Sequence, residues 1–80
     1  MELRQQIWEC VTSVAPEAEL DTLDSGADLR EELDLDSMDF LRVLIAVKEA
    51  TGVEVPERDY PRVRSLDALV EYVAATRRSG

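Results

Sequence analysis

The stretch that decides the fold is Leu33-Asp34-Leu35-Asp36-Ser37-Met38-Asp39-Phe40-Leu41, where an acidic loop turns into a helix. Asp36 and Ser37 are both of the residue types that cap helices, and Gly52 suits the left-handed position just past a helix end. We therefore expect a helix from Asp36-Ser37 to about residue 51. On a helical wheel one side of this helix is apolar and belongs to a core; its members are Phe40, Val43, Leu44, Val47 and Thr51.

Two more long helices are predicted from apolar residues that recur every three or four positions. The first covers Glu2 to Val14, and the last follows Ser65, which suits its N-cap. The segment from Pro16 to Asp36 is polar and rich in turns, so we expect a long ordered loop with one helical turn near Leu29 to Leu33.

The remaining segment joins the central and last helices. Val53 to Pro56 predicts an extended connector, followed by a short helix at Glu57 to Tyr60 that Pro61 ends. The expected fold is all-α, with a single domain over residues 1–80. It is a small four-helix bundle of three main helices and one short helix, with a long loop between the first and second helices.

Composition argues against an enzyme. Histidine is absent, which removes Ser-His-Asp and Cys-His catalysis and imidazole metal ligation. The one cysteine, Cys10, forms no internal disulfide and is interpreted as core packing. An EF-hand starting at Asp34 would need glutamate where the chain has Ile45, so no metal site is expected. An enzyme that uses a pair of carboxylates, as glycosidases do, is not expected either, because acidic residues are abundant enough here to form such pairs by chance and no cavity is evident.

Charge indicates which partners fit. Residues 1–40 hold 12 acids and 2 bases, a net −10, whereas residues 41–80 hold 6 acids and 7 bases, a net +1; together they give −9. Such a chain repels nucleic acid and anionic membrane and attracts basic protein surfaces. No apolar run approaches the ~20 residues of a membrane span, and the charged first ten residues hold no signal-peptide core. We expect a cytoplasmic monomer without membrane insertion.

A second apolar stripe runs along the central helix, away from its core side. It consists of Met38, Leu41 and Ile45. The long loop could fold over this stripe, or the stripe could be a surface on which partner proteins dock. The docking hypothesis names these residues as partner-binding: Asp36, Met38, Asp39, Leu41, Arg42, Ile45 and Glu49.

The opening stretch resembles the attachment motif of acyl carrier proteins, an Asp-Ser-Leu core that follows a leucine-bearing acidic loop and opens a helix. Met38 stands where leucine is commoner. The resemblance covers nearly the whole chain and includes Gly52, Val53 to Pro56 and Ser65-Leu66. It implies that Ser37 receives 4'-phosphopantetheine from coenzyme A through a magnesium-dependent phosphopantetheinyl transferase.

The same resemblance implies a carrier function. The arm's thiol would hold acyl groups as thioesters and present them to acyl-loading and acyl-processing enzymes, whose basic docking surfaces Asp36 and Asp39 would help to recruit. Without the resemblance, an Asp-Ser pair before a helix would most simply be a cap.

Two departures from the family pattern bear on the pathway. Arg42 and Lys48 lie where carriers of fatty acid synthesis usually keep acids, and Asp34-Leu35 replaces their glycine and small or sulfur-bearing residue. We therefore expect a specialised freestanding carrier rather than a housekeeping one. The alternatives are a peptidyl or aminoacyl carrier, and a helical protein-binding module without a prosthetic group.

Overall fold

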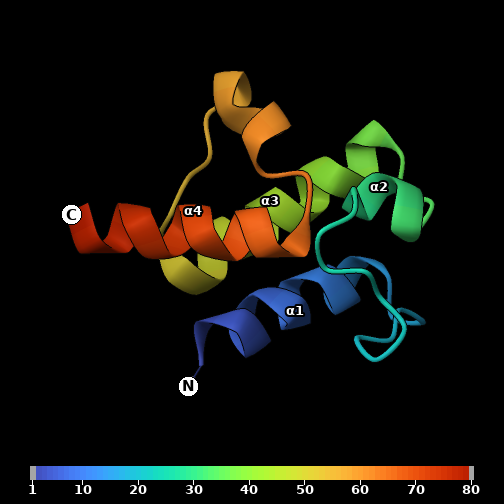
Figure 1. The fold of residues 1–80 in the computed structure, drawn as a ribbon. Helices are drawn as coiled ribbons and strands as arrows, with labels where there is room; N and C mark the ends of the chain where they lie inside the picture. Colours follow the sequence, from blue (N-terminus) through green and yellow to red (C-terminus); the bar gives the residue numbers. More distant parts are fainter. Residues whose placement is uncertain (1, 80) are drawn as a thin grey trace.

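The computed structural model describes residues 2–79, and all regular elements in this range are helical (Figure 1). The elements in chain order are α1 (Leu3–Val14), α2 (Leu29–Glu32), α3 (Ser37–Thr51), the 3-10 helix η1 (Glu57–Arg62) and α4 (Leu66–Ser79). The predicted all-α class and the three main helices are confirmed. Two short helical segments accompany them rather than one, because the expected turn in the long loop is a helix of its own.

The long helices surround one apolar core. Helix α1 packs against both α3 and α4, and Figure 1 shows α1 and α4 running side by side. Their facing stripes supply most of the side chains with no exposed surface: Ile7, Val11, Val43, Val47, Leu66, Leu69 and Val73. Burial of such stripes is the main force that stabilises a domain of this size.

Helix α3 follows the predicted pattern of faces and ends. Phe40, Val43, Leu44 and Val47 are buried, and Thr51 is half-buried with its hydroxyl bonded to a carbonyl of the preceding turn. Gly52 has φ 79°, the left-handed conformation predicted for it.

Pro61 does not end the short helix, contrary to the prediction. Helix η1 continues to Arg62 with Pro61 inside it. Two backbone hydrogen bonds flank Pro61. The amide of Asp59 donates to the carbonyl of Pro56 (2.9 Å), and the amide of Val63 donates to the carbonyl of Tyr60 (3.1 Å). Neither hydrogen bond needs a backbone N–H at position 61, which proline does not have, so the 3-10 helix accommodates Pro61.

The long loop between α1 and α3 is tied to the rest of the fold. Leu29 at the start of α2 is fully buried, and its amide donates a 2.7 Å hydrogen bond to the carbonyl of Arg64. The side chain of Asp28 caps α2 by accepting from the amide of Arg30 at 2.8 Å. Leu20, by contrast, is exposed and does not contribute to the core.

Cys10 lies in the core, as predicted, with its thiol 3.4 Å from the carbonyl of Gln6. Burial raises the pKa of this thiol, which keeps it protonated and unreactive. Among the helices of residues 2–79, none combines the length and the apolar character that a membrane span needs.

Candidate functional site

A reciprocal pair of hydrogen bonds sets the start of α3. The amide of Asp39 donates to Oδ1 of Asp36 at 2.8 Å, and the amide of Asp36 donates to Oδ2 of Asp39 at 3.5 Å. This capping box makes Asp36 the N-cap and Ser37 the first residue of the helix. The sequence allowed either residue to cap; the structure gives that role to Asp36.

The hydroxyl of Ser37 is therefore free. The residue is exposed, and its side chain has no hydrogen-bond partner among residues 2–79. The first turn of a helix presents unpaired backbone amides and the positive end of the helix dipole, which stabilise a phosphate ester. The position therefore fits an attached phosphodiester and is open to an enzyme that would place it there.

The turn before the capping box sets where Ser37 emerges. Asp34 has φ 53°, a left-handed conformation that aspartate tolerates better than most residues, and the amide of Leu35 then donates to the carbonyl of Arg30 at 2.9 Å. The acidic loop thus ends in a tight reversal against α2. The sequence did not predict this reversal, although an aspartate after the helical turn is the signal that could have indicated it.

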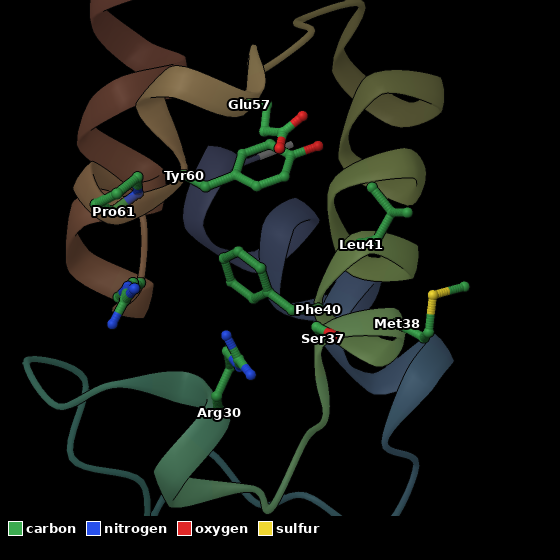
Figure 2. A pocket seen from close by; sticks show the side chains of 9 residues that line it. Arg30, Ser37, Met38, Phe40, Leu41, Glu57, Tyr60 and Pro61 are labelled. Atoms are coloured by element: carbon green, nitrogen blue, oxygen red, sulfur yellow. The ribbon is translucent and has the colours of Figure 1, made fainter.

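The second apolar stripe on α3 faces solvent. Met38 is 59% exposed and Ile45 51%, while Leu41 between them is half-buried. Figure 2 shows Met38 pointing away from Phe40, on the outer side of the helix. The alternative that the long loop covers this stripe is therefore wrong.

Charged residues lie along the same stripe. The carboxylate of Asp39 is 3.8 Å from the guanidinium of Arg42, a largely exposed pair within one turn of α3. Glu49 is exposed near the C-terminal end of the helix. All predicted partner-binding residues thus belong to one helix and its N-cap.

A groove of about 520 Å³ opens beside Ser37, between α2, α3 and η1 (Figure 2). The rings of Phe40 and Tyr60 meet in it edge to face, with centroids 6.2 Å apart and planes at 84°. Its lining consists of Arg30, Ser37, Met38, Phe40, Leu41, Glu57, Tyr60, Pro61 and Arg64. The sequence did not predict this groove, because its walls come from three segments that no local pattern connects.

Metal ligands do not converge on the site. Within the described part of the chain, no group of three or more Cys, Asp or Glu side chains is arranged to hold a metal ion. The carboxylates of Asp36 and Asp39 are instead engaged in the capping box.

Comparison of the sequence with known proteins places the chain in a family. The family model described as "Phosphopantetheine attachment site" matches residues 5–73. A mitochondrial acyl carrier protein of Neurospora crassa is 36% identical over 47 residues, which are 59% of this chain and 35% of that protein. The acyl carrier protein of Rubrobacter xylanophilus is 32% identical over 47 residues, 59% of this chain and 58% of that protein.

A third relative, mitochondrial acyl carrier protein 2 of Arabidopsis thaliana, is 33% identical over 49 residues, 61% of this chain and 39% of that protein. The matched region thus spans about a third to three fifths of the length of these curated relatives. No solved structure gives a significant match. Because the family match covers most of its length, the chain belongs to the acyl carrier protein family, whose members are carriers with a covalently attached 4'-phosphopantetheine and not enzymes.

Proposed function

We propose that Ser37 is the residue that carries the 4'-phosphopantetheine arm. One observation supports this above the others: the hydroxyl of Ser37 is exposed and has no hydrogen-bond partner among the described residues, while Asp36 performs the capping. A serine that capped the helix would have its oxygen occupied by a backbone amide. The free hydroxyl leaves Ser37 available for modification without disturbing the helix start.

In the modification, Ser37 Oγ would form a new P–O bond as the pyrophosphate bond of coenzyme A breaks. Adenosine 3',5'-bisphosphate would leave, and the serine proton would pass to a base on the transferase. When attached, the group supplies a terminal thiol that holds an acyl cargo as a thioester. The chain's own contribution is to hold Oγ at a rigid helix start where the backbone amides offset the added negative charge.

The test is direct modification of the purified protein. Incubation with coenzyme A, Mg²⁺ and a phosphopantetheinyl transferase should add one phosphopantetheinyl group by intact mass, and peptide mapping should place it on Ser37. The variant Ser37→Ala should remain folded, because the wild-type side chain makes no hydrogen bond to any described residue, and it should stay unmodified, because alanine has no hydroxyl. Ser13→Ala, on α1, is the matched control and should be modified fully. A folded protein that several transferases leave bare would contradict the proposal.

We also propose that the exposed stripe of Met38, Leu41 and Ile45 docks the transferase and the acyl-loading and acyl-processing enzymes. Apolar side chains that are half exposed beside Asp36, Asp39 and Arg42 favour a partner surface with an apolar centre and basic rim. The variant Ile45→Glu should lower kcat/KM of modification at least tenfold with the unfolding midpoint unchanged. Leu20→Glu, at an exposed leucine in the long loop and outside the α3 stripe, is its control.

For the pathway, we propose a specialised carrier. Arg42 pairs with Asp39, and Lys48 pairs with Glu54 at 3.2 Å, so α3 and its surroundings present both signs of charge. A uniformly basic partner surface would meet two local repulsions here. Cargo identification on protein purified from its native cells tests this: a simple fatty acyl series would contradict a specialised role, and an aminoacyl group would favour the peptidyl-carrier alternative.

For the setting, we propose that the protein acts as a monomer in the cytoplasm. A single unpaired thiol, Cys10, suits a reducing compartment. Fractionation of the native cells and sedimentation of the purified protein test the two statements. The alternative of a binding module without a prosthetic group predicts that Ser37→Ala keeps full biological activity.

A further inference from the structure

Two guanidinium groups share the groove with the hydroxyl of Ser37. Arg30 comes from α2, and Arg64 from the link between η1 and α4. The hydrogen bond from the amide of Leu29 to the carbonyl of Arg64, 2.7 Å long, holds these two segments together. Figure 2 shows Arg30 reaching from α2 toward the opening bounded by Phe40 and Ser37. A positive end of the groove thus lies next to the proposed attachment residue.

The positive charge at this end is poorly neutralised within the protein. Arg30 is half-buried, yet none of the ion pairs among residues 2–79 involves it. In the described part of the chain, the only carboxylate paired with Arg64 is that of Asp28, at 3.7 Å, and the other oxygen of Asp28 already accepts a hydrogen bond from the amide of Arg30. In a chain of net charge −9, a half-buried arginine without a carboxylate partner has a guanidinium that is free to bind an anion from outside the polypeptide.

The surroundings of Ser37 are electrostatically asymmetric. The carboxylates of Asp36 and Asp39 are engaged in the capping box and do not line the groove. Arg30 and Arg64 line the groove, where Glu57 is the one acidic residue among the lining residues. A phosphodiester on Ser37 is repelled by the first pair and attracted by the second. The backbone amides at the start of the helix would stabilise the phosphate but would not determine in which direction the attached arm extends. The attraction to the two arginines favours an arm that extends into the groove.

We propose that Arg30 and Arg64 bind the phosphodiester on Ser37 and thereby direct the pantetheine arm into the groove, against Phe40 and Tyr60, when no partner enzyme is bound. This inference rests on the proposed attachment at Ser37. Guanidinium groups suit the task because their planar donors bind phosphate oxygens in pairs. A partner that docks on the α3 stripe with its own basic groups would compete for the phosphate and release the arm.

The experiment uses the modified protein with an isotope-labelled arm. In the wild type, we expect nuclear Overhauser effects from the methyl groups of the arm to the rings of Phe40 and Tyr60, and a ³¹P shift different from that of the urea-unfolded holo protein. In Arg30→Gln and Arg64→Gln the cross-peaks should weaken by about two- to fivefold, as for a partly exposed charge pair. Added salt should weaken them in the wild type as well.

Two further variants and a folding check keep the test specific. Arg78→Gln removes the same charge from the end of α4, far from the groove lining, and should leave the cross-peaks and the ³¹P shift unchanged. Arg30→Lys keeps the positive charge but lacks the planar guanidinium, so its cross-peaks should be stronger than those of Arg30→Gln and weaker than those of the wild type. Circular dichroism verifies that Arg30→Gln and Arg64→Gln are folded, since the backbone bonds of both residues do not depend on their side chains.

Two failures can be told apart. If mass spectrometry finds no group on Ser37, the attachment itself is wrong. If the group is present but the wild type shows no contacts with Phe40 or Tyr60, or if the glutamine variants match the wild type, the attachment stands and the role of Arg30 and Arg64 is overturned.

Discussion

The guanidinium of Arg4 lies 2.9 Å from Oδ1 of Asp67 and ties the first turn of α1 to the first turn of α4. The other oxygen of Asp67 accepts a 3.1 Å hydrogen bond from the hydroxyl of Ser25 in the long loop. The backbone amide of Asp67 in turn donates to the carbonyl of Ser25 at 3.0 Å. One aspartate therefore joins two helices and the loop.

The first prediction concerns the titration of Asp67. The hydrogen bond from Arg4 has the largest effect on the pKa of this carboxyl, and the hydrogen bond from Ser25 the next largest; both lower the pKa below its usual range. Its contribution to stability is therefore present above the ordinary aspartate pKa of about 3.9 and is lost as the pH falls through the lowered value. A ¹³C titration should find its midpoint below that of a free aspartate.

The variant Arg4→Gln should return the midpoint of Asp67 toward the ordinary value, and high salt should do so in part because both groups are exposed. Arg77→Gln, which removes a charge at the other end of α4, serves as the control. A midpoint at or above the ordinary value in the wild type would contradict this assignment.

The second prediction tests the helix cap. Asp36→Ala removes the acceptor of the 2.8 Å bond from the amide of Asp39 and should lower the free energy of unfolding by about 1 kcal/mol. Asp36→Asn keeps a capping oxygen and should stay within about 0.5 kcal/mol of the wild type in the same urea titration. Equal losses in the two variants would show that the charge of Asp36, and not its capping bond, stabilises α3.

The third prediction separates the two apolar sides of α3. Val47 is fully buried, so Val47→Ala should cost about 2 kcal/mol in unfolding free energy, from the lost methyl groups and the space they leave. Ile45 is 51% exposed, and Ile45→Ala should change stability by less than about 0.5 kcal/mol. Chemical denaturation of both variants measures the difference, and similar losses would mean that Ile45 is buried in solution.

The fourth prediction concerns the end of α3. Gly52 has φ 79° and nothing within 4 Å of the place where a Cβ would stand. Gly52→Ala should therefore destabilise through backbone strain alone, by about 1 kcal/mol. Gly52→Asn should cost less, because asparagine adopts this conformation more readily. Thermal unfolding of the two variants tests whether Gly52→Ala is less stable than Gly52→Asn. A Gly52→Ala variant as stable as the wild type would exclude backbone strain at this position.

Local sequence patterns were sufficient to predict most of the helices. The spacing of apolar residues predicted α1, α3 and α4 and the core side of α3, because the period of a helix involves only residues three or four positions apart in the sequence. The same holds for Gly52 and for the helical turn that forms α2. Pro61 was misjudged because its effect depends on which backbone amides a 3-10 turn uses, and residue type alone does not specify that.

The sequence by itself determined the all-α class, the main helices, the second apolar stripe of α3 and the resemblance that singles out Ser37, since each of these depends on residues close together in the chain. That this stripe faces solvent, and is not covered by the long loop, was decided by the tertiary structure. The tertiary structure alone decided that Asp36 caps α3 and leaves the Ser37 hydroxyl free, because two capping residue types stand side by side and only the backbone path selects one. It also decided the groove and its two arginines. Arg30 and Arg64 line the same groove because a backbone hydrogen bond joins α2 to the segment before α4. The spacing of residues along the chain cannot predict such a contact between distant segments.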